Sequence, residues 1–193
     1  YEADDLIATV APRAEAGGMD AVLVTGDKDA LQLVNDHIRV LNEPKGLWLD
    51  AAAVRARYGV PPERLTDLFA LAGDATDNVP GVRGIGEKTA ASLLQQFGSL
   101  DGIYRSLDQV PGALREKLRT GHDAAYQSLA LVRLAEDAPV NQEPRDLRPG
   151  PYRDDLLIPF LERMEFRRLI ADLRGAGGDA SPLTPALSPE GRG

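Results

Sequence analysis

The sequence of 193 residues contains no cysteine. Disulfide bonds and thiolate metal sites are therefore excluded, and any bound metal must be held by oxygen ligands or by the two histidines, His37 and His122. Both histidines are distant in sequence from the acidic motifs described below and are interpreted as surface or helix residues. A site made of oxygen ligands alone favours magnesium, manganese or calcium.

Long apolar runs are also missing. No stretch approaches the roughly 18 residues that a membrane-spanning helix needs, and the first residues lack the order of charged, apolar and small residues found in a signal peptide. The composition, with 43% hydrophobic and 27% charged residues, is that of a globular domain. These features predict a cytoplasmic protein without a membrane partner.

Positive charge is scarce, because the formal net charge is −8. Such a balance argues against a nucleic-acid partner, since phosphate binding requires Lys and Arg. The charge is unevenly distributed, however: residues 1–77 contain 14 acidic and 7 basic residues, whereas residues 81–119 contain 6 basic and 4 acidic residues. An acidic region followed by a mildly basic one is the pattern expected of a cation site beside a phosphate-binding surface.

The first 50 residues have the pattern of an α/β layer. Apolar spacing predicts a helix over 2–16, kinked or split at Pro12, and the run 21–24 predicts a buried strand. A short helix over 29–34 and strands over 38–41 and 47–49 follow. Two of the few aromatic residues, Trp48 and Phe69, are expected in the core rather than on a base-stacking surface.

The remainder of the chain is predicted to be helical, with a charged, proline-containing linker over 137–151. The expected helices span residues 51–58, 63–71, 87–97, 100–107, 113–119, 123–134 and 154–173. Residues 175–193 contain too much glycine and proline to pack a core and are expected to form a disordered tail. The chain is thus divided into an α/β part over 1–60, a helical part over 61–174 and the tail.

Seven carboxylates lie in three short motifs at junctions between the predicted elements: Glu2, Asp4 and Asp5, then Asp27 and Asp29, then Asp74 and Asp77. Within the first motif, positions 2 and 5 share one face of a helix. The second motif follows a strand end. In an extended segment, side chains two positions apart, such as those of Asp27 and Asp29, point to one side. The third lies in a turn or helix start, where its members can converge.

Clustered carboxylates of this kind suit two-metal phosphodiester hydrolysis, in which each cation needs several hard oxygen ligands. All seven are therefore candidate catalytic and metal-binding residues. Any one pair could instead be a helix cap or a solvated acidic face. The presence of all three motifs favours the metal site, because acids packed this closely repel one another unless a cation joins them.

A glycine-rich segment over 80–90, PGVRGIGEKTA, is the second functional signal. It is not a Walker A loop, because Glu87 separates Gly86 from Lys88, and it is not a dinucleotide fingerprint, because Thr89 stands where a third glycine is required. It fits a hairpin between two helices, in which the amides that begin the second helix face a DNA phosphate. An ordinary interhelical turn is the alternative. The candidate DNA-binding residues are Gly81, Arg83, Gly84, Ile85, Gly86, Lys88 and Thr89.

These motifs, in this order, closely resemble the 5′-3′ exonuclease domain of bacterial DNA polymerase I and its flap endonuclease relatives, over residues 1 to about 170. The resemblance implies a PIN-like α/β nuclease fold followed by a helix-hairpin-helix, or helix-three-turn-helix, subdomain that clamps duplex DNA irrespective of sequence. It implies two Mg²⁺ or Mn²⁺ ions, one held by Glu2, Asp4 and Asp5 and the other by Asp27, Asp29 and Asp77, with Asp74 nearby. It also implies K⁺ at the hairpin, a monomer, and hydrolysis of DNA flaps and 5′ ends.

The chain also departs from the family pattern. The family begins earlier, with strands that carry further aspartates and with a helical arch, whereas this sequence starts at Tyr1 inside a patterned segment. We therefore expect an N-terminally incomplete fold that is nearly inactive by itself. A non-catalytic helix-hairpin-helix DNA-binding fragment stays open as an alternative, and so does a magnesium-dependent phosphatase suggested by Thr25-Gly26-Asp27, although the phosphatase leaves the hairpin unexplained.

Overall fold

The computed structural model describes residues 1–148, 150 and 153–175. The chain divides into two compact units, Tyr1–Leu147 and Arg148–Gly193. None of the helices in the described residues is long and apolar enough to cross a membrane. The predicted tail over 176–193 lies outside the described residues.

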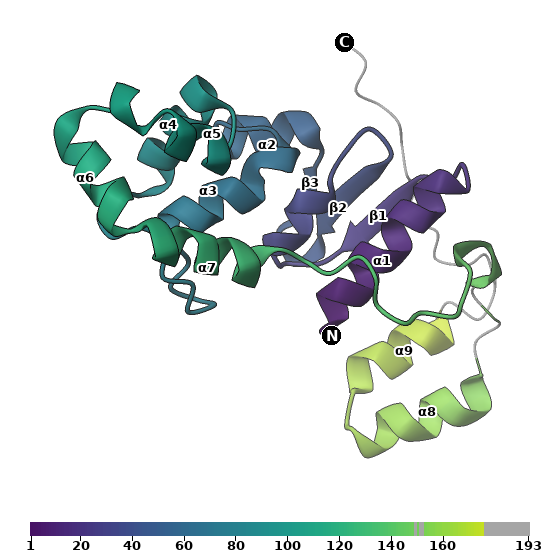
Figure 1. Ribbon diagram of the computed structural model, residues 1–193. Coiled ribbons are helices and arrows are strands. Elements are labelled where there is room, and N and C mark those ends of the chain that lie inside the picture. Colours follow the sequence, from purple (N-terminus) through teal and green to yellow (C-terminus); the bar gives the residue numbers. More distant parts are fainter. Residues whose placement is uncertain (149, 151–152, 176–193) are drawn as a thin grey trace, which may run out of the picture. The chain divides into compact units, whose positions relative to one another are not determined.

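The N-terminal part of the first unit contains a three-stranded sheet of order β1-β2-β3 (Figure 1). Its elements are α1 (Ala3–Ala16), β1 (Ala21–Val24), the 3-10 helix η1 (Asp29–Leu33), β2 (Ile38–Asn42), η2 (Glu43–Lys45) and β3 (Leu47–Leu49). Strand β1 is parallel to β2, with Leu23 opposite Val40, and β3 is antiparallel to β2, with Leu49 opposite Val40. The predicted strands are confirmed, and the short helix after β1 is a 3-10 helix.

Helix α1 continues through Pro12, so of the two expected outcomes the split is wrong and the kink stays a prediction. Its start is fixed by a capping box, in which the Glu2 backbone N–H donates to the Asp5 carboxylate at 2.8 Å. The buried face consists of small residues, Ala8, Thr9, Ala11 and Ala14, whereas the larger Leu6 is 43% exposed. Small side chains allow the helix to lie close to η1 and β1.

The helices that follow complete the first unit. They are α2 (Ala51–Tyr58), η3 (Pro62–Arg64), α3 (Leu65–Ala72), α4 (Glu87–Phe97), α5 (Leu100–Arg105), η4 (Leu107–Gln109), α6 (Gly112–Thr120), α7 (His122–Val132) and η5 (Pro144–Asp146). The predicted helices agree with these bounds, except that two of them end in or begin with a separate 3-10 turn. Within the described residues, β-structure after β3 is limited to one isolated bridge between Asp74 and Val79.

Helix α3 is the centre of the core, because it packs against α4, α5, α7 and η1. Leu65, Leu68, Ala70 and Leu71 are fully buried. Phe69 is 3% exposed, which confirms its predicted place in the core. Helix α3 therefore connects the sheet layer to the helical layer, and the segment that carries Asp74 and Asp77 follows directly after it.

The prediction for Trp48 is wrong, because this side chain is 39% exposed. Trp48 lies opposite Leu41, and Val24 lies opposite Leu41 on the other side, so the three share one face of the sheet. Val24 is 65% exposed, and the Arg39 guanidinium lies over the Trp48 ring at 5.5 Å. The accessible face of the sheet explains why this tryptophan is not in the core.

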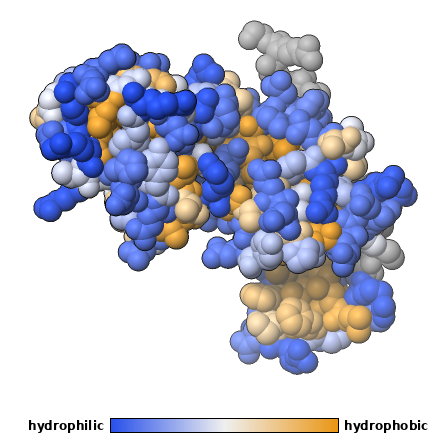
Figure 2. Space-filling view, in the orientation of Figure 1, coloured by the Kyte–Doolittle hydropathy of each residue, from blue (hydrophilic) through white to orange (hydrophobic). Residues whose placement is uncertain are grey.

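The second unit contains two helices, α8 (Asp154–Arg163) and α9 (Arg167–Gly175), where the sequence predicted one. The chain turns at Glu165, which has a left-handed φ of 59°. Apolar side chains remain on the surface of this unit (Figure 2), namely Leu156, Phe160, Met164, Phe166 and Leu169. The apolar spacing continues across the turn, which is why the pattern resembled a single helix.

Candidate metal centre and DNA-binding hairpin

A closed loop between α3 and the hairpin presents the third acidic motif. Asp74 and Val79 exchange two backbone hydrogen bonds, of 2.9 and 2.8 Å. Gly73 and Gly81 meet at the base of this loop, and both have left-handed φ values, of 74° and 60°. A Cβ atom on Gly81 would lie 2.3 Å from the Gly73 nitrogen, so only glycine permits the two backbones to approach this closely.

The second acidic motif lies in a turn just after β1. The Asp27 N–H donates to Thr25 Oγ1 at 3.0 Å, and the Asp29 N–H donates to Asp27 Oδ1 at 2.9 Å. Lys28 has a helical backbone conformation and Asp29 begins η1. The expectation of an extended segment is therefore wrong. One oxygen of Asp27 is used by the backbone, whereas Asp29 is directed toward the loop of the third motif.

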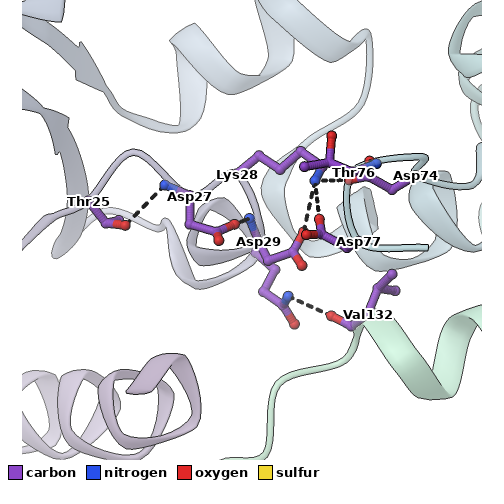
Figure 3. A network of polar contacts seen from close by, with 9 residues as sticks. Thr25, Asp27, Lys28, Asp29, Asp74, Thr76, Asp77 and Val132 are labelled. Carbon is purple, nitrogen blue, oxygen red and sulfur yellow. Dashed lines mark hydrogen bonds and ion pairs between the residues drawn. The ribbon is translucent and has the colours of Figure 1, made fainter. Parts of the chain in front are cut away.

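The two motifs meet at the Lys28 side chain, whose ammonium lies among Asp29, Asp74 and Asp77 (Figure 3). It donates to Asp77 Oδ2 at 2.8 Å and forms an ion pair with Asp74. Asp29 Oδ1 lies 3.9 Å from the same nitrogen. The fold thus brings together carboxylates that are 45 to 48 positions apart in the sequence, as the residue numbers show.

Asp5, in the first motif, has a structural role. Its two carboxylate oxygens accept backbone N–H groups from Glu2 and Ala135, both at 2.8 Å. These hydrogen bonds lower the pKa of the Asp5 carboxyl. The bond to Ala135 fastens the start of α1 to the chain after α7. The metal-binding roles of Glu2, Asp4 and Asp5 stay predictions.

Like charges and burial together raise the pKa of two acids in this region. Burial raises the pKa of Asp29 to about 6; the Lys28 ammonium opposes this, and the charges of Asp27, Asp77 and Asp4 add to it. Burial is also the largest cause of the raised pKa of Asp4, and the charges of Asp27, Glu2 and Asp5 raise it further, in that order of size. The first motif is therefore within electrostatic reach of the second.

These carboxylates fit a divalent cation by donor chemistry. The Asp74 Oδ2 atom is buried, and its partner is the Lys28 ammonium. In the described part of the chain, no three acidic or histidine side chains are arranged so that they could hold a metal ion directly. At the meeting point of the second and third motifs, Lys28 occupies the place of a cation. The residues fit a cation, provided that this lysine moves.

The hairpin begins directly after the loop of the third motif. The Val82 N–H donates to the Leu71 carbonyl at 2.8 Å, and Val82 and Ile85 are buried under the turn. Arg83, Gly84, Gly86 and Lys88 are exposed, and Thr89 is half-buried. Helix α4 starts at Glu87 without a side-chain cap, so its first N–H groups are available to an anion. Of the candidate DNA-binding residues, Ile85 and Gly81 support the turn instead of presenting a polar group.

Two lysines of the site are not among the residues that the sequence predicts. Lys28 stands between two candidate aspartates, and this position was the available signal for it. Lys117, on α6, donates from Nζ to the Gly84 carbonyl at 3.1 Å and adds a positive charge to the exposed turn of the hairpin. The mildly basic composition of residues 81–119 was the only indication of it, because nothing in the sequence pairs α6 with the hairpin.

The two histidines are surface residues, as predicted. His37 Nδ1 lies 2.9 Å from the Asp20 carboxylate, and its side chain is 58% exposed. His122 packs against the rings of Tyr104 and Tyr126, and its side chain is 52% exposed. Among the described residues, neither imidazole pairs with any of the seven candidate carboxylates.

Comparison with known families gives two adjoining matches. Residues 1–59 match the model of the 5′-3′ exonuclease, N-terminal resolvase-like domain. Residues 60–155 match the model of the 5′-3′ exonuclease, C-terminal SAM fold. The two matches contain the acidic motifs and the hairpin.

Among curated proteins, the thermostable DNA polymerase I of Thermus filiformis is 41% identical over 180 residues, which is 93% of this chain. The thermostable DNA polymerase I of Thermus thermophilus is 41% identical over 192 residues, or 99% of this chain. The chain spans only 22% and 23% of the length of these two relatives.

Among solved structures, the T5 5′-exonuclease with bound zinc superposes with a TM-score of 0.62 and 26% identity, covering 69% of this chain and 50% of the other. A complex of the T5 flap endonuclease with DNA and metal ions gives a TM-score of 0.62 with 25% identity, covering 69% and 50%. The catalytic core of Rad2 with a DNA substrate shares the fold, with a TM-score of 0.53 and 21% identity over 84% of this chain and 57% of the other. These neighbours confirm the predicted PIN-like nuclease fold.

Proposed function

Since the chain belongs to the 5′-3′ exonuclease family, a family of metal-dependent nucleases, we propose that it hydrolyses DNA phosphodiester bonds at 5′ ends and flaps. The observation that carries this proposal is the convergence of Asp29, Asp74 and Asp77 on one cation position, directly before a hairpin that presents helix N–H groups. In the Thermus relatives the matching region belongs to DNA polymerase I, so we assign the reaction to primer removal and repair during replication.

The acids would hold two divalent cations, Mg²⁺ or Mn²⁺. One would bind between Asp29, Asp74 and Asp77, with Asp27 beside them, and the other near Asp4, with Glu2 and Asp5. When bound, such cations supply Lewis acidity toward the phosphate and an activated water. The metal ions bound in the T5 structures support a divalent cation in this fold.

The protein's own side chains prepare the site. Burial of Asp29 and of the Asp74 carboxylate removes competing water from those oxygens, so that their interaction with a cation is strong. The Gly73–Gly81 contact fixes the loop that carries Asp74 and Asp77. The acids are thereby held in place before any ligand arrives, which reduces the ordering cost of binding.

The hairpin would bind duplex DNA through phosphates. The first N–H groups of α4 supply a neutral anion site, and Arg83, Lys88 and Lys117 supply positive charge. Phosphate contacts carry no sequence information, so binding would be independent of sequence. The backbone carbonyls of the turn would also accept K⁺, and we assign a monomer as the DNA-binding form.

A non-catalytic DNA-binding module is the second candidate. The observation in its favour is that the hairpin and its Lys117 contact are assembled by α3, α4 and α6 without using any of the seven acids. Such a module would bind DNA equally well with or without divalent cations and would not cleave it.

The deciding experiment incubates residues 1–193 with a labelled 5′-flap duplex in Mg²⁺ or Mn²⁺. We expect slow incision that is abolished by EDTA and by Asp77→Asn but retained by Asp36→Asn, which removes the same charge from an exposed position outside the acidic motifs. DNA binding with neither cation-dependent incision nor Mn²⁺ binding that depends on Asp77 would contradict the nuclease assignment and leave the binding module.

A further inference from the structure

Lys28 connects the two acidic segments that would bind a cation. Its side chain is 29% exposed, and its ammonium contacts Asp74 and Asp77 in one segment and lies near Asp29 in its own. The same ammonium lies 5.6 Å from the centre of the buried Phe69 ring, on the core helix α3. The ammonium therefore has four neighbouring groups, three carboxylates and one aromatic ring, whereas a lysine in an ordinary surface ion pair has a single acidic partner.

Carboxylates surround the Lys28 ammonium. It donates a hydrogen bond to Asp77 Oδ2 at 2.8 Å, pairs with Asp74, and lies 3.9 Å from Asp29 Oδ1. The positive charge therefore offsets part of the repulsion among the carboxylates. Without it, Asp29, Asp74 and Asp77 would face one another with no counter-ion between them.

We propose that Lys28 is a built-in counter-ion of the cation site: it holds the Asp74–Val79 loop against the turn of Asp29 in the metal-free protein, and a divalent cation must displace it. This inference rests on the proposed function, because it concerns the same carboxylates. Lysine suits the role, since its compact charge is carried on a flexible stem that can leave toward solvent without disturbing the backbone.

Two opposite effects follow from such a counter-ion. Lys28 keeps the acids in place before a cation binds, which stabilises the metal-free fold. It also competes with the cation for Asp74 and Asp77, which weakens cation affinity. A lysine that served only as a structural ion pair would give the first effect without the second.

The test measures Mn²⁺ affinity and thermal stability for the chain and its Lys28→Met variant at fixed ionic strength. Mn²⁺ binding is followed by electron paramagnetic resonance of the free ion, which does not depend on catalysis. We expect Lys28→Met to bind Mn²⁺ about tenfold more tightly, the order expected on removing one unit charge about 4 Å from a cation in a partly solvated site. We also expect a lower Tm without Mn²⁺ and a larger rise in Tm on adding it.

Matched variants separate this effect from a general change in charge or folding. Lys45→Met removes the same charge from an exposed position in η2 and should change Mn²⁺ affinity less than twofold. Lys28→Arg keeps the charge and should retain the affinity of the unmodified chain, and Lys28→Gln replaces the Met variant if that variant does not fold.

The outcomes distinguish the inference from the proposed function. If neither the chain nor any variant binds Mn²⁺, the cation centre itself is wrong. If the chain binds Mn²⁺ in a manner that depends on Asp77 but Lys28→Met and Lys28→Gln bind no more tightly than Lys45→Met, the cation centre stands and the counter-ion role of Lys28 is overturned.

Discussion

Asp29 is a residue at which function and stability oppose each other. Its pKa is raised from 3.8 to about 6, so the folded chain holds the proton more tightly than the unfolded chain does. Stability therefore decreases as the pH rises from 3.8 to about 6, and the loss persists at higher pH. Replacing this carboxyl by a neutral amide should remove the penalty.

We accordingly expect Asp29→Asn to raise the Tm of the metal-free chain at about pH 8, with the difference disappearing as the pH falls below the ordinary carboxyl value. Thermal denaturation followed by circular dichroism across this range would measure it. Asp36→Asn is the control and should give a small difference that does not vary in this way. A destabilising effect of Asp29→Asn at about pH 8 would show that its charge is compensated rather than strained.

Asp77 should affect cleavage without affecting DNA affinity. Its carboxylate is partly exposed and contacts Lys28, away from the hairpin amides that would bind phosphate. Asp77→Asn should therefore reduce Mn²⁺ affinity at least about tenfold and abolish incision, while the Kd for a duplex in EDTA changes less than about twofold. Fluorescence anisotropy gives the Kd, and equal losses of DNA and Mn²⁺ binding would contradict the separation of the two sites.

At the scale of elements, the loop closed by Gly73 and Gly81 is the most sensitive connection. Gly81→Ala would place a Cβ atom 2.3 Å from a backbone nitrogen at a left-handed φ of 60°. We expect a loss of about 3 kcal/mol in the free energy of unfolding, together with weaker Mn²⁺ binding, because Asp74 and Asp77 would no longer be held.

Gly112→Ala is the matched control for that substitution. Gly112 begins α6, and a Cβ atom there would meet no atom within 4 Å. It should leave both urea denaturation and Mn²⁺ affinity nearly unchanged. If Gly81→Ala were equally harmless, the loop would have to be closed by something other than the glycine contact.

The hairpin should bind DNA by charge and not by sequence. With roughly two phosphates neutralised, the logarithm of the association constant should fall with the logarithm of the salt concentration at a slope of about −2. Lys117→Met should make that slope shallower by about one, to about −1, whereas Lys45→Met should not change it. Anisotropy titrations at several salt concentrations, with duplexes of different sequence, would measure both, and a marked sequence preference would contradict phosphate binding.

The sequence predicted most elements correctly where periodicity is local. The strands over 38–41 and 47–49 and the helices over 51–58 and 87–97 agree with the structure because their apolar spacing and end signals lie within the element. The single helix over 154–173 was wrong because a left-handed turn at Glu165 interrupts it, and a single backbone dihedral leaves no trace in apolar spacing.

At the scale of the whole molecule, the uneven charge is explained by the site. Three acids of the first 77 residues, Asp29, Asp74 and Asp77, meet at the Lys28 ammonium, and five of the six basic residues over 81–119 belong to the hairpin and α6. The sequence indicated which acids to consider, because they occur in compact motifs. It could not show that Lys28 lies between two of those motifs or that Lys117 reaches the hairpin, because both contacts depend on chain packing over long separations.

The most direct test of the account is the anomalous diffraction of crystals soaked in Mn²⁺. We predict a manganese peak bonded to carboxylate oxygens of Asp29, Asp74 and Asp77, with the Lys28 ammonium displaced from between them. A structure with Lys28 still paired to Asp74 and Asp77 in saturating Mn²⁺, and with no manganese at these carboxylates, would contradict the cation centre on which the proposed nuclease activity depends.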